Sequence, residues 1–327
     1  MERILSDSSV LVTGGAGFIG SNLVGSLLLS GNYVVCLDNF STGKRENLKE
    51  YLLNPKFKLI EGDIRNYDEC LNAVRGIDIV FHQAALGSVP RSIKDPVTTT
   101  DVNIGGYVKM LFAAKESGVK RFIYAASSST YGDHPALPKV EDKIGSPLSP
   151  YAITKYVDEL YATNFANTYG IEIIGLRYFN VFGRRQDPEG AYAAVIPKFL
   201  KMLRNHESPV INGDGSYSRD FTYIDNVIQA NHLAAVVNNK DALNQVYNVA
   251  YGERTTLNQL YEQIQKIAGT YDPEVLKVKL LYGPERAGDI PHSLASVEKA
   301  KRLLGYSPTH SVSEGLEEAV KWFWNNL

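Results

Sequence analysis

Cysteine is scarce in this sequence of 327 residues: Cys36 and Cys70 are the only two. Such a small number of cysteines argues against a disulfide framework and favours a reducing compartment. We therefore expect a cytoplasmic protein. The first residues, "MERILSDSS", lack the apolar core of a signal peptide. No stretch approaches the roughly 20 apolar residues that a membrane span requires, so no membrane association is expected.

Charge of one sign is not in excess either. The chain has 34 Lys and Arg against 36 Asp and Glu, and no basic run, which gives no electrostatic reason to expect nucleic acid. The six histidines are scattered, and none has the H-E-x-x-H spacing, so no metal site is expected. An apolar fraction of 44% is that of an ordinary globular protein.

Strand-like and helix-like segments alternate through the first half of the chain. An apolar, β-branched run ends at Thr13, a helix is expected over about Phe18–Leu29, and "YVVCLD" reads as a buried strand. Further strands are indicated by "KLIEGD", "DIVFHQAA", "RFIYAASS" and "IEIIGLRY", each after a plausible helix. This alternation predicts an α/β fold with a doubly wound parallel sheet of the Rossmann type.

The alternation ends near Tyr178, where loops rich in Gly, Asn, Asp and Pro begin. We expect residues 1–177 to form the first domain and residues 178–327 to form mainly a smaller C-terminal lobe over the carboxyl edge of the sheet. Within the second half, "SRDFTYIDNVIQANHLAAV" reads as a strand and helix that return to the first domain, over about 217–250. The last 32 residues read as two helices.

The run "TGGAGFIG" follows the first strand and opens the first helix, the context in which a glycine pattern becomes informative. It satisfies G-x-G-x-x-G through Gly15, Gly17 and Gly20, and G-x-x-G-x-x-G through Gly14, Gly17 and Gly20. Small residues let the backbone approach a pyrophosphate, whose charge is met by the free N–H groups and positive dipole end of the helix. The run therefore predicts a dinucleotide site.

Asp38 ends the second strand, 18 residues after Gly20. A carboxylate there can accept hydrogen bonds from the adenosine ribose and would repel a 2'-phosphate, which favours NAD over NADP as the cofactor. Asp63 and Ile64 end the third strand, and "QAA" follows the fourth. At these strand ends they can line the adenine of the cofactor and the ribose that follows it. The further cofactor contacts that we predict are Phe18, Ile19, Asn39, Asp63, Ile64, Gln83, Ala84 and Ala85.

The stretch "SPYAITKY" places Tyr151 and Lys155 four positions apart at the start of an expected helix, so that they share a face. A phenol has a pKa near 10 and is a poor base at neutral pH, but a close ammonium favours the phenolate. Ser127, at the end of the fifth strand, would hydrogen-bond the reacting oxygen. We predict that Tyr151 acts as the base, and that Lys155 lowers the pKa of the phenol and holds the ribose.

Together, "TGGAGFIG", "SSSTYG", "YAITK" and "RYFNVFG" resemble the extended short-chain dehydrogenase/reductases. Within them the chain resembles, over nearly its whole length, the NAD-dependent UDP-hexose 4-epimerases, most of all the bacterial UDP-N-acetylglucosamine 4-epimerases. The resemblance implies an isomerase that keeps NAD bound. It removes hydride from carbon 4 of the sugar, turns over the 4-keto intermediate and returns the hydride to the opposite face.

The resemblance also implies contacts with a UDP-sugar, and it places Tyr178 beside the nicotinamide. Asn180 matches a position near the sugar and phosphates, Arg219 and Arg286 match phosphate contacts, and Ser293 matches a gate beside the sugar's 2-substituent. A small gate residue leaves space for an N-acetyl group and favours UDP-GlcNAc and UDP-GalNAc. The implied substrate-binding residues are Gly87, Ser88, Ser127, Ser128, Ser129, Asn180, Ala194, Val195, Asn212, Arg219, Arg286, Asp289 and Ser293.

Related enzymes begin with the same oxidation. Sugar-nucleotide 4,6-dehydratases carry an Asp-Glu pair after the residue that matches Ser127, and UDP-glucuronate decarboxylases typically carry a Glu in this turn, whereas here Ser128 and Ser129 follow. UDP-glucuronate 4-epimerase stays open as an alternative, with Arg91 a candidate for its carboxylate. A non-catalytic nucleotide-binding protein is a second alternative, from another class, although it would be expected to have lost Tyr151 or Lys155.

We also expect a homodimer, which the resemblance implies too. The helices expected over about 97–117 and 150–169 carry more apolar side chains than one face can bury against the sheet. A two-fold, four-helix interface would cover the remainder. The positions concerned are Val108, Leu111, Phe112, Val157, Leu160 and Phe165.

Overall fold

A single parallel sheet of seven strands forms the larger part of the computed structural model, which describes residues 4–189, 194–285 and 290–326. The strand order is β11-β6-β5-β4-β1-β2-β3, so the chain reverses direction across the sheet between β1 and β4. The doubly wound Rossmann fold is thereby confirmed. The strands are β1 (Ser9–Thr13), β2 (Tyr33–Asp38), β3 (Phe57–Glu61), β4 (Ile79–His82), β5 (Arg121–Ser127), β6 (Glu172–Tyr178) and β11 (Gln245–Val249).

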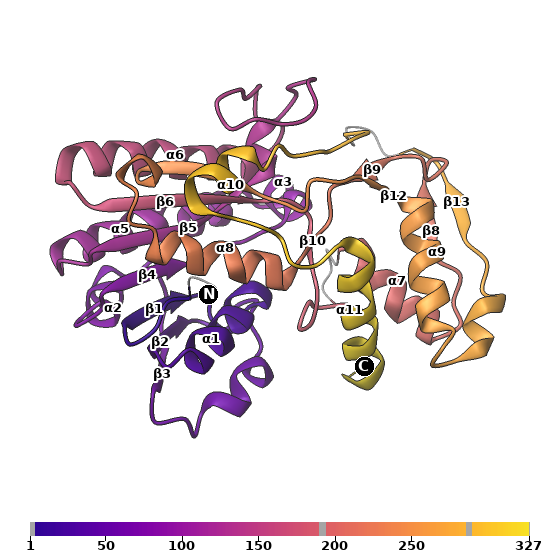
Figure 1. The fold of residues 1–327 in the computed structure, drawn as a ribbon, viewed down its shortest axis with the longest axis horizontal. Coiled ribbons are helices and arrows are strands. Elements are labelled where there is room, and N and C mark those ends of the chain that lie inside the picture. Colours follow the sequence, from indigo (N-terminus) through magenta and orange to yellow (C-terminus); the bar gives the residue numbers. More distant parts are fainter. Residues whose placement is uncertain (1–3, 190–193, 286–289, 327) are drawn as a thin grey trace.

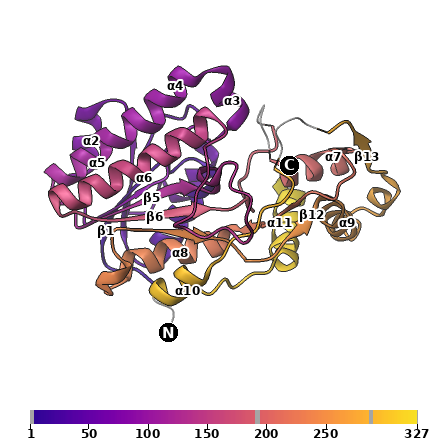
Figure 2. The same ribbon diagram turned by 90° about the horizontal axis from the view of Figure 1, so that it is seen from above.

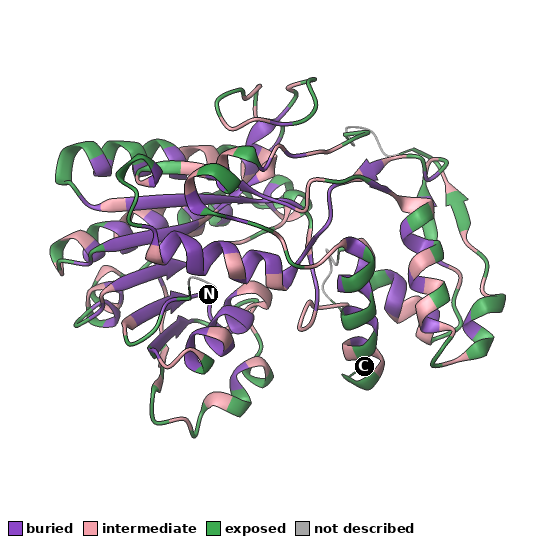
Figure 3. Ribbon diagram, in the orientation of Figure 1, coloured by how far each residue is buried: buried purple, intermediate pink, exposed green. Residues whose placement is uncertain are grey.

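Helices cover both faces of this sheet (Figures 1 and 2). One face carries α1 (Phe18–Leu29), which has the bounds expected from the sequence, and α8 (Ile224–Val236). The other face carries α2 (Tyr67–Ala73), α5 (Tyr107–Glu116) and α6 (Pro150–Tyr169). Because both faces are covered, the central strands are buried throughout, which explains their unbroken apolar runs (Figure 3). The carboxyl edge of the sheet is therefore the part that is left open for ligands.

Helix α6 begins where the sequence provides a start signal. The side chain of Ser149 accepts a hydrogen bond from Ala152 N, and Pro150 occupies the first helical position. The helix ends at Gly170, whose φ of 72° is the left-handed conformation that glycine adopts most readily. This start places Tyr151 in the first turn of α6, beside the carboxyl end of β5.

Before α5 the chain forms α3 (Val89–Lys94), α4 (Pro96–Thr100) and a π-helical turn, η2 (Asp101–Gly106). The helix expected over about 97–117 is therefore present, with a π-helical segment within it. Short 3-10 helices follow β2 and β5: η1 (Arg45–Tyr51) and η3 (Ser128–Tyr131).

Beyond β6 the chain builds a smaller lobe, at the right of Figure 1, from three longer helices and short strand pairs. Strand β7 pairs with β10, β9 pairs with β12, and β8 pairs with β13. The elements are β7 (Val181–Phe182), α7 (Val195–Arg204), β8 (Val210–Asn212), β9 (Ser218–Arg219), β10 (Thr222–Tyr223), β12 (Thr255–Thr256), α9 (Leu257–Ala268), η5 (Pro273–Lys277), β13 (Leu281–Gly283) and α11 (Val312–Asn326).

The segment over 217–250 contributes both to the smaller lobe and to the first domain. The strand just before α8 is β10, which pairs with β7, and α8 itself packs on the large sheet. The strand that joins the sheet is β11, which comes after α8, beyond the short η4 (Lys240–Ala242), and pairs with β6. The two helices expected at the end of the chain are confirmed as α10 (Glu298–Leu304), which packs near β11, and α11. The domain limits themselves stay a prediction.

The core forms two groups of buried side chains. One lies under α1 and α8 and continues into the smaller lobe, and the other lies under α2, α5 and α6. Among the residues that the structure describes, no helix is both long and apolar enough to cross a membrane.

Candidate active site

The glycine turn after β1 is packed too tightly for other residues. Gly14 has a φ of +66°, and a Cβ on it would lie 2.7 Å from the Cα of Ala84. A Cβ on Gly20 would lie 2.1 Å from the carbonyl oxygen of Gly14, so α1 packs directly against the turn. Gly15 instead faces the core, where its Cβ would meet the sulfur of Cys36 at 2.4 Å. Gly14, Gly17 and Gly20 line the cavity described next and Gly15 does not, so the structure favours the pattern through those three.

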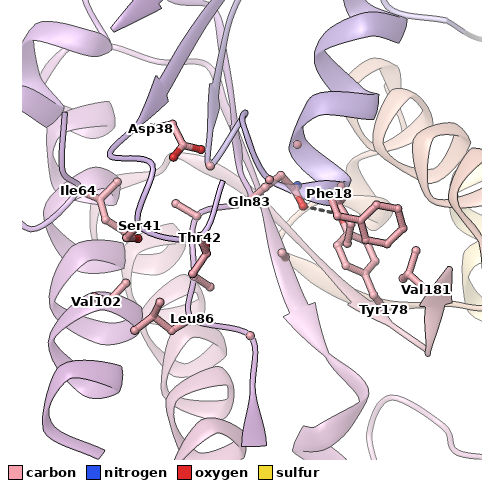
Figure 4. A pocket seen from close by; sticks show the side chains of 18 of the residues that line it. Phe18, Asp38, Ser41, Thr42, Ile64, Gln83, Leu86, Val102, Tyr178 and Val181 are labelled. Carbon is pink, nitrogen blue, oxygen red and sulfur yellow. Dashed lines mark hydrogen bonds between the residues drawn. The ribbon is translucent and has the colours of Figure 1, made fainter. Parts of the chain in front are cut away.

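A cavity of about 520 Å³ opens at this turn and follows the carboxyl ends of β1, β2, β4 and β5 (Figure 4). Every residue predicted to contact the cofactor lines it, from the adenosine end at Asp38 to the expected nicotinamide end at Tyr151. These residues are Gly14, Gly17, Phe18, Ile19, Gly20, Asp38, Asn39, Asp63, Ile64, Gln83, Ala84, Ala85, Tyr151, Lys155 and Tyr178. A long cavity that begins at a tight glycine turn and a helix N-terminus fits a dinucleotide.

Asp38 is held rigidly at the end of β2. Its Oδ2 accepts a hydrogen bond from Ala16 N at 2.8 Å, and its Oδ1 accepts one from Phe40 N at 2.8 Å. Burial raises the pKa of this carboxyl, and the two backbone N–H groups lower it in part. Each oxygen keeps a second lone pair, so Asp38 can still accept from ribose hydroxyls.

Asp63 lies near Asp38 in the same cavity lining. Its Oδ2 accepts from Asn39 Nδ2 at 2.8 Å, and hydrogen bonds from the Arg65 side chain lower its pKa to about 2.

At the other end of the cavity, the hydroxyl of Tyr178 donates to Gln83 Oε1 at 3.2 Å and accepts from Asn231 Nδ2 at 3.0 Å. Burial raises the pKa of Tyr178 to about 12, so this phenol stays neutral.

The structure brings Ser127, Tyr151 and Lys155 together on one cavity. Lys155 is only 3% exposed, and its Nζ donates to the carbonyl oxygen of Ala125 at 3.0 Å and to Asp158 Oδ2 at 3.1 Å. One of its three N–H bonds is left for the cavity. The sequence reading missed Asp158, which is fully buried, and burial raises its pKa to about 7.

Ser127 accepts hydrogen bonds at Oγ from Ser129 N (3.2 Å) and Ser129 Oγ (2.9 Å). The hydroxyl proton of Ser127 is not used in these two bonds, so it can point into the cavity that Ser127 lines. Ser128 lines the cavity too, whereas Ser129 does not and contacts Ser127 from behind. Ser128 and Ser129, which the sequence left undistinguished, therefore hold different positions.

A second cavity, of about 780 Å³, lies between the sheet and the smaller lobe and meets the first at Gly87, Asn180 and Val181. Ser293 lines neither of these two cavities; its N–H donates to Ser218 O at 3.0 Å, beside Arg219. Arg286 and Asp289 lie outside the described residues. The predicted substrate residues that line the second cavity are Gly87, Ser88, Asn180, Ala194, Val195, Asn212 and Arg219.

Several lining residues were missed by the sequence reading. Those just after Asp38 could have been found, because they continue the loop in which that aspartate lies. Arg185 and Asp187 come from a loop far along the chain, and nothing in their local sequence marks them. The missed residues of the first cavity include Ser41, Thr42, Lys44, Asn47, Arg185 and Asp187.

Comparison with known proteins identifies the family to which this fold belongs. A family model described as the NAD dependent epimerase/dehydratase family matches residues 10–250. The chain belongs to this family. NAD is accordingly its cofactor, as Asp38 and the glycine turn predicted.

The relatives span the whole chain. The UDP-glucose 4-epimerase of Mycolicibacterium smegmatis is 36% identical over 96% of this chain and 98% of its own length. The UDP-glucuronate 4-epimerase of Thermodesulfobacterium geofontis is 34% identical over 97% of this chain and 96% of its own. Among solved structures, the UDP-N-acetylglucosamine 4-epimerase from Methanobrevibacter ruminantium in complex with UDP-N-acetylmuramic acid has a TM-score of 0.91 and 40% identity, covering 99% of this chain and 100% of that one. The expected enzyme class, an isomerase of the UDP-sugar 4-epimerase type, is confirmed.

Proposed function

We propose that this epimerase interconverts UDP-GlcNAc and UDP-GalNAc. The observation that carries the proposal is the meeting of two cavities at Gly87, Asn180 and Val181, the first of which is also lined by Ser127, Tyr151 and Lys155. One cavity suits the dinucleotide, and the other is lined by the residues that the resemblance assigns to the UDP-sugar. The sugar would lie where they meet, within reach of the proposed base. A solved relative with 40% identity is a UDP-N-acetylglucosamine 4-epimerase, which supports the choice of sugar.

NAD, when bound, supplies the acceptor for the hydride from carbon 4 of the sugar. Tyr151 would remove the proton from the 4-hydroxyl group and later return it. Tyr151 lies in the first turn of α6, and Lys155, four residues on, would hold the ribose. Ser127, polarised by the two hydrogen bonds that it accepts from Ser129, would donate a hydrogen bond to the reacting oxygen and keep its proton.

The turn after Ser127 disfavours dehydration. In η3 the residues after Ser127 are Ser128, Ser129, Thr130 and Tyr131, so this turn carries no carboxylate. Elimination across carbons 5 and 6 requires an acid and a base near those carbons. Oxidation at carbon 4 would therefore be followed by return of the hydride.

Small residues around the sugar support an acetylated substrate. A Cβ on Gly87 would meet nothing within 4 Å, so the space beside this residue is open. Ala194, another small residue, lines the second cavity. Ser293, which the resemblance identifies as the gate, lines neither cavity and adds no support. An N-acetyl group needs such space, and the proposal includes the plain hexoses as additional substrates.

UDP-glucuronate is the second candidate, because a relative at 34% identity acts on it. Arg91 follows Ser88, Val89 and Pro90, which line the second cavity, and its backbone N–H donates to Ser88 Oγ at 3.2 Å. Incubation with UDP-GlcNAc, UDP-glucose and UDP-glucuronate in turn, with the products resolved by chromatography, decides between the candidates. Fastest turnover of UDP-glucuronate would refute our choice of sugar.

The proposal includes a homodimer with a four-helix interface. Leu111 and Phe165 are buried within the chain itself, so they would add nothing to that interface. Other apolar side chains on the same helices remain exposed: Val97, Phe112, Ile153 and Leu160. Covering them against a second copy removes apolar surface from water. Sedimentation of the wild type and of Leu160→Glu tests this, and a wild-type monomer at micromolar concentration would reject the dimer.

We further propose a cytoplasmic role in supplying sugar nucleotides for polysaccharide synthesis. Both cysteines are free and buried, which suits a reducing compartment.

A further inference from the structure

Two loops that lie far apart in the sequence meet at the rim of the dinucleotide cavity. Lys44 lies in the loop after β2, and Asp187 lies in the loop after β7, yet both line this one cavity. The Lys44 Nζ contacts Asp187 Oδ1 at 2.7 Å. Their side chains are 46% and 38% exposed, so the contact lies at the rim of the cavity rather than on its floor.

The loop after β2 is also attached to the glycine turn. The backbone N–H of Lys44 donates to the carbonyl oxygen of Ala16 at 3.0 Å, and Asn47 Nδ2 donates to the same oxygen at 2.9 Å. Ala16 lies within the turn over which a pyrophosphate is expected. The Lys44–Asp187 contact is therefore tethered directly beside the pyrophosphate position.

Arg185 attaches the second loop to the same region. Its Nη1 donates to the carbonyl oxygen of Ser21, in the first turn of α1, at 2.9 Å. Its Nη2 donates to the hydroxyl of Tyr51 at 3.0 Å and pairs with Glu50. The guanidinium is mostly buried, with 14% of the side chain exposed. The loop after β7 is thus fastened to α1 and η1 next to the point where Asp187 reaches Lys44.

We propose that the Lys44–Asp187 ion pair, fastened by Arg185, is a clasp that retains NAD between turnovers. In the proposed clasp, the ion pair joins the two loops that form opposite walls of the cavity, over a dinucleotide that lies along the glycine turn. Leaving the cavity then requires the ion pair to open, whereas epimerisation does not. The clasp concerns the cofactor alone and does not depend on which sugar reacts.

A simpler electrostatic reading makes the opposite prediction for one residue. If Lys44 only attracted the anionic pyrophosphate, Asp187 would repel it, and removing the Asp187 charge would slow NAD release. The clasp requires both partners, so removing that charge speeds release. Asp187→Asn is the decisive variant, since an asparagine oxygen can still accept the hydrogen bond that Asp187 Oδ1 now accepts from Glu189 N.

The experiment measures the rate at which NAD leaves the purified holoenzyme, with no sugar present and well below the unfolding temperature. Released NAD is trapped by an added alcohol dehydrogenase with ethanol, and the NADH formed is followed by absorbance. The strength typical of an exposed ion pair predicts that Asp187→Asn and Lys44→Ala each release NAD about 1.4- to fivefold faster. High salt should accelerate release from the wild type more than from Asp187→Asn.

Charge exchange gives a second, independent readout. Lys44→Asp and Asp187→Lys each place like charges together and should release NAD faster, and the double variant should return toward the wild-type rate. Lys277→Ala is the matched control, because it removes an exposed ion pair with Glu274 on η5, whose residues line neither cavity. Its release rate should equal that of the wild type.

Slower or unchanged release from Asp187→Asn, or a double exchange variant no slower than the single ones, would overturn the clasp. A control variant that releases NAD as fast as Asp187→Asn would do the same. Because no sugar is added, the result is independent of the substrate proposal.

Discussion

Gly20 offers a direct test of how closely α1 must approach the glycine turn. In Gly20→Ala the new Cβ would lie 2.1 Å from the carbonyl oxygen of Gly14, and 2.8 Å from that carbonyl carbon and from the Cα of Gly15. Contacts under 3.0 Å essentially do not occur, so helix and turn must separate by about 0.9 Å. The obstacle is backbone, which has no side chain to rotate away.

That displacement is large on the scale of a hydrogen bond. The N–H groups at the start of α1 must lie about 2.7–3.2 Å from a phosphate oxygen, and a shift approaching 1 Å takes them out of range. Overpacking of this kind also costs about 1–3 kcal/mol of folding free energy. We therefore expect Gly20→Ala to be purified with little NAD and to melt at a lower temperature.

The assay is the ratio of NAD to protein after desalting, together with a melting curve. Gly87→Ala is the matched control, because it changes a glycine of the same cavity whose new Cβ meets nothing within 4 Å, and it should keep its NAD. A Gly20→Ala protein with full NAD content and an unchanged melting temperature would refute the argument from close approach.

Four further predictions address the other parts of the site. Tyr151→Phe should keep NAD and lose about 10²–10⁴-fold in kcat, since only the proton-transferring hydroxyl is removed; near-normal turnover would mean that another group is the base. Asp38→Ala should weaken NAD binding and relax discrimination against NADP, whereas equal retention of both cofactors by the unaltered protein would contradict the role of Asp38. The resemblance predicts that Ser293→Tyr abolishes turnover of acetylated sugars by steric exclusion. The place of Ser293 outside both cavities predicts little change instead, so an unchanged rate with UDP-GlcNAc would show that Ser293 is not the gate. Burial, and then the Lys155 charge, lower the pKa of His82 to about 3, so between pH 6.5 and 3 the unfolded chain binds a proton there that the folded chain does not. The free energy of unfolding present above pH 6.5 should fall by up to about 1.4 kcal/mol per pH unit on acidification. When that free energy is measured by urea unfolding, it should depend less steeply on pH in His82→Gln than in the wild type.

The sequence by itself determined those features that depend on local spacing. A strand of unbroken apolar residues, a glycine turn and a helix follow one another within about 20 residues, so their order was sufficient to predict the dinucleotide site. Tyr151 and Lys155 share a helix face because of the 3.6-residue repeat, and both line the expected cavity. The resemblance extended this to the second half, where its residue roles remain predictions.

Only the tertiary structure decided what depends on contacts between distant segments. It distinguished Gly14 from Gly15, because the choice depends on which one faces Ala84 and which one faces Cys36. It placed Asp158 behind Lys155, and it assigned the seventh strand of the sheet to β11. Lys44 and Asp187 are 143 residues apart, and no periodicity relates them. Their contact exists because the chain leaves the sheet after β6 and returns across the cavity, a path fixed by the packing of the whole fold rather than by any local pattern.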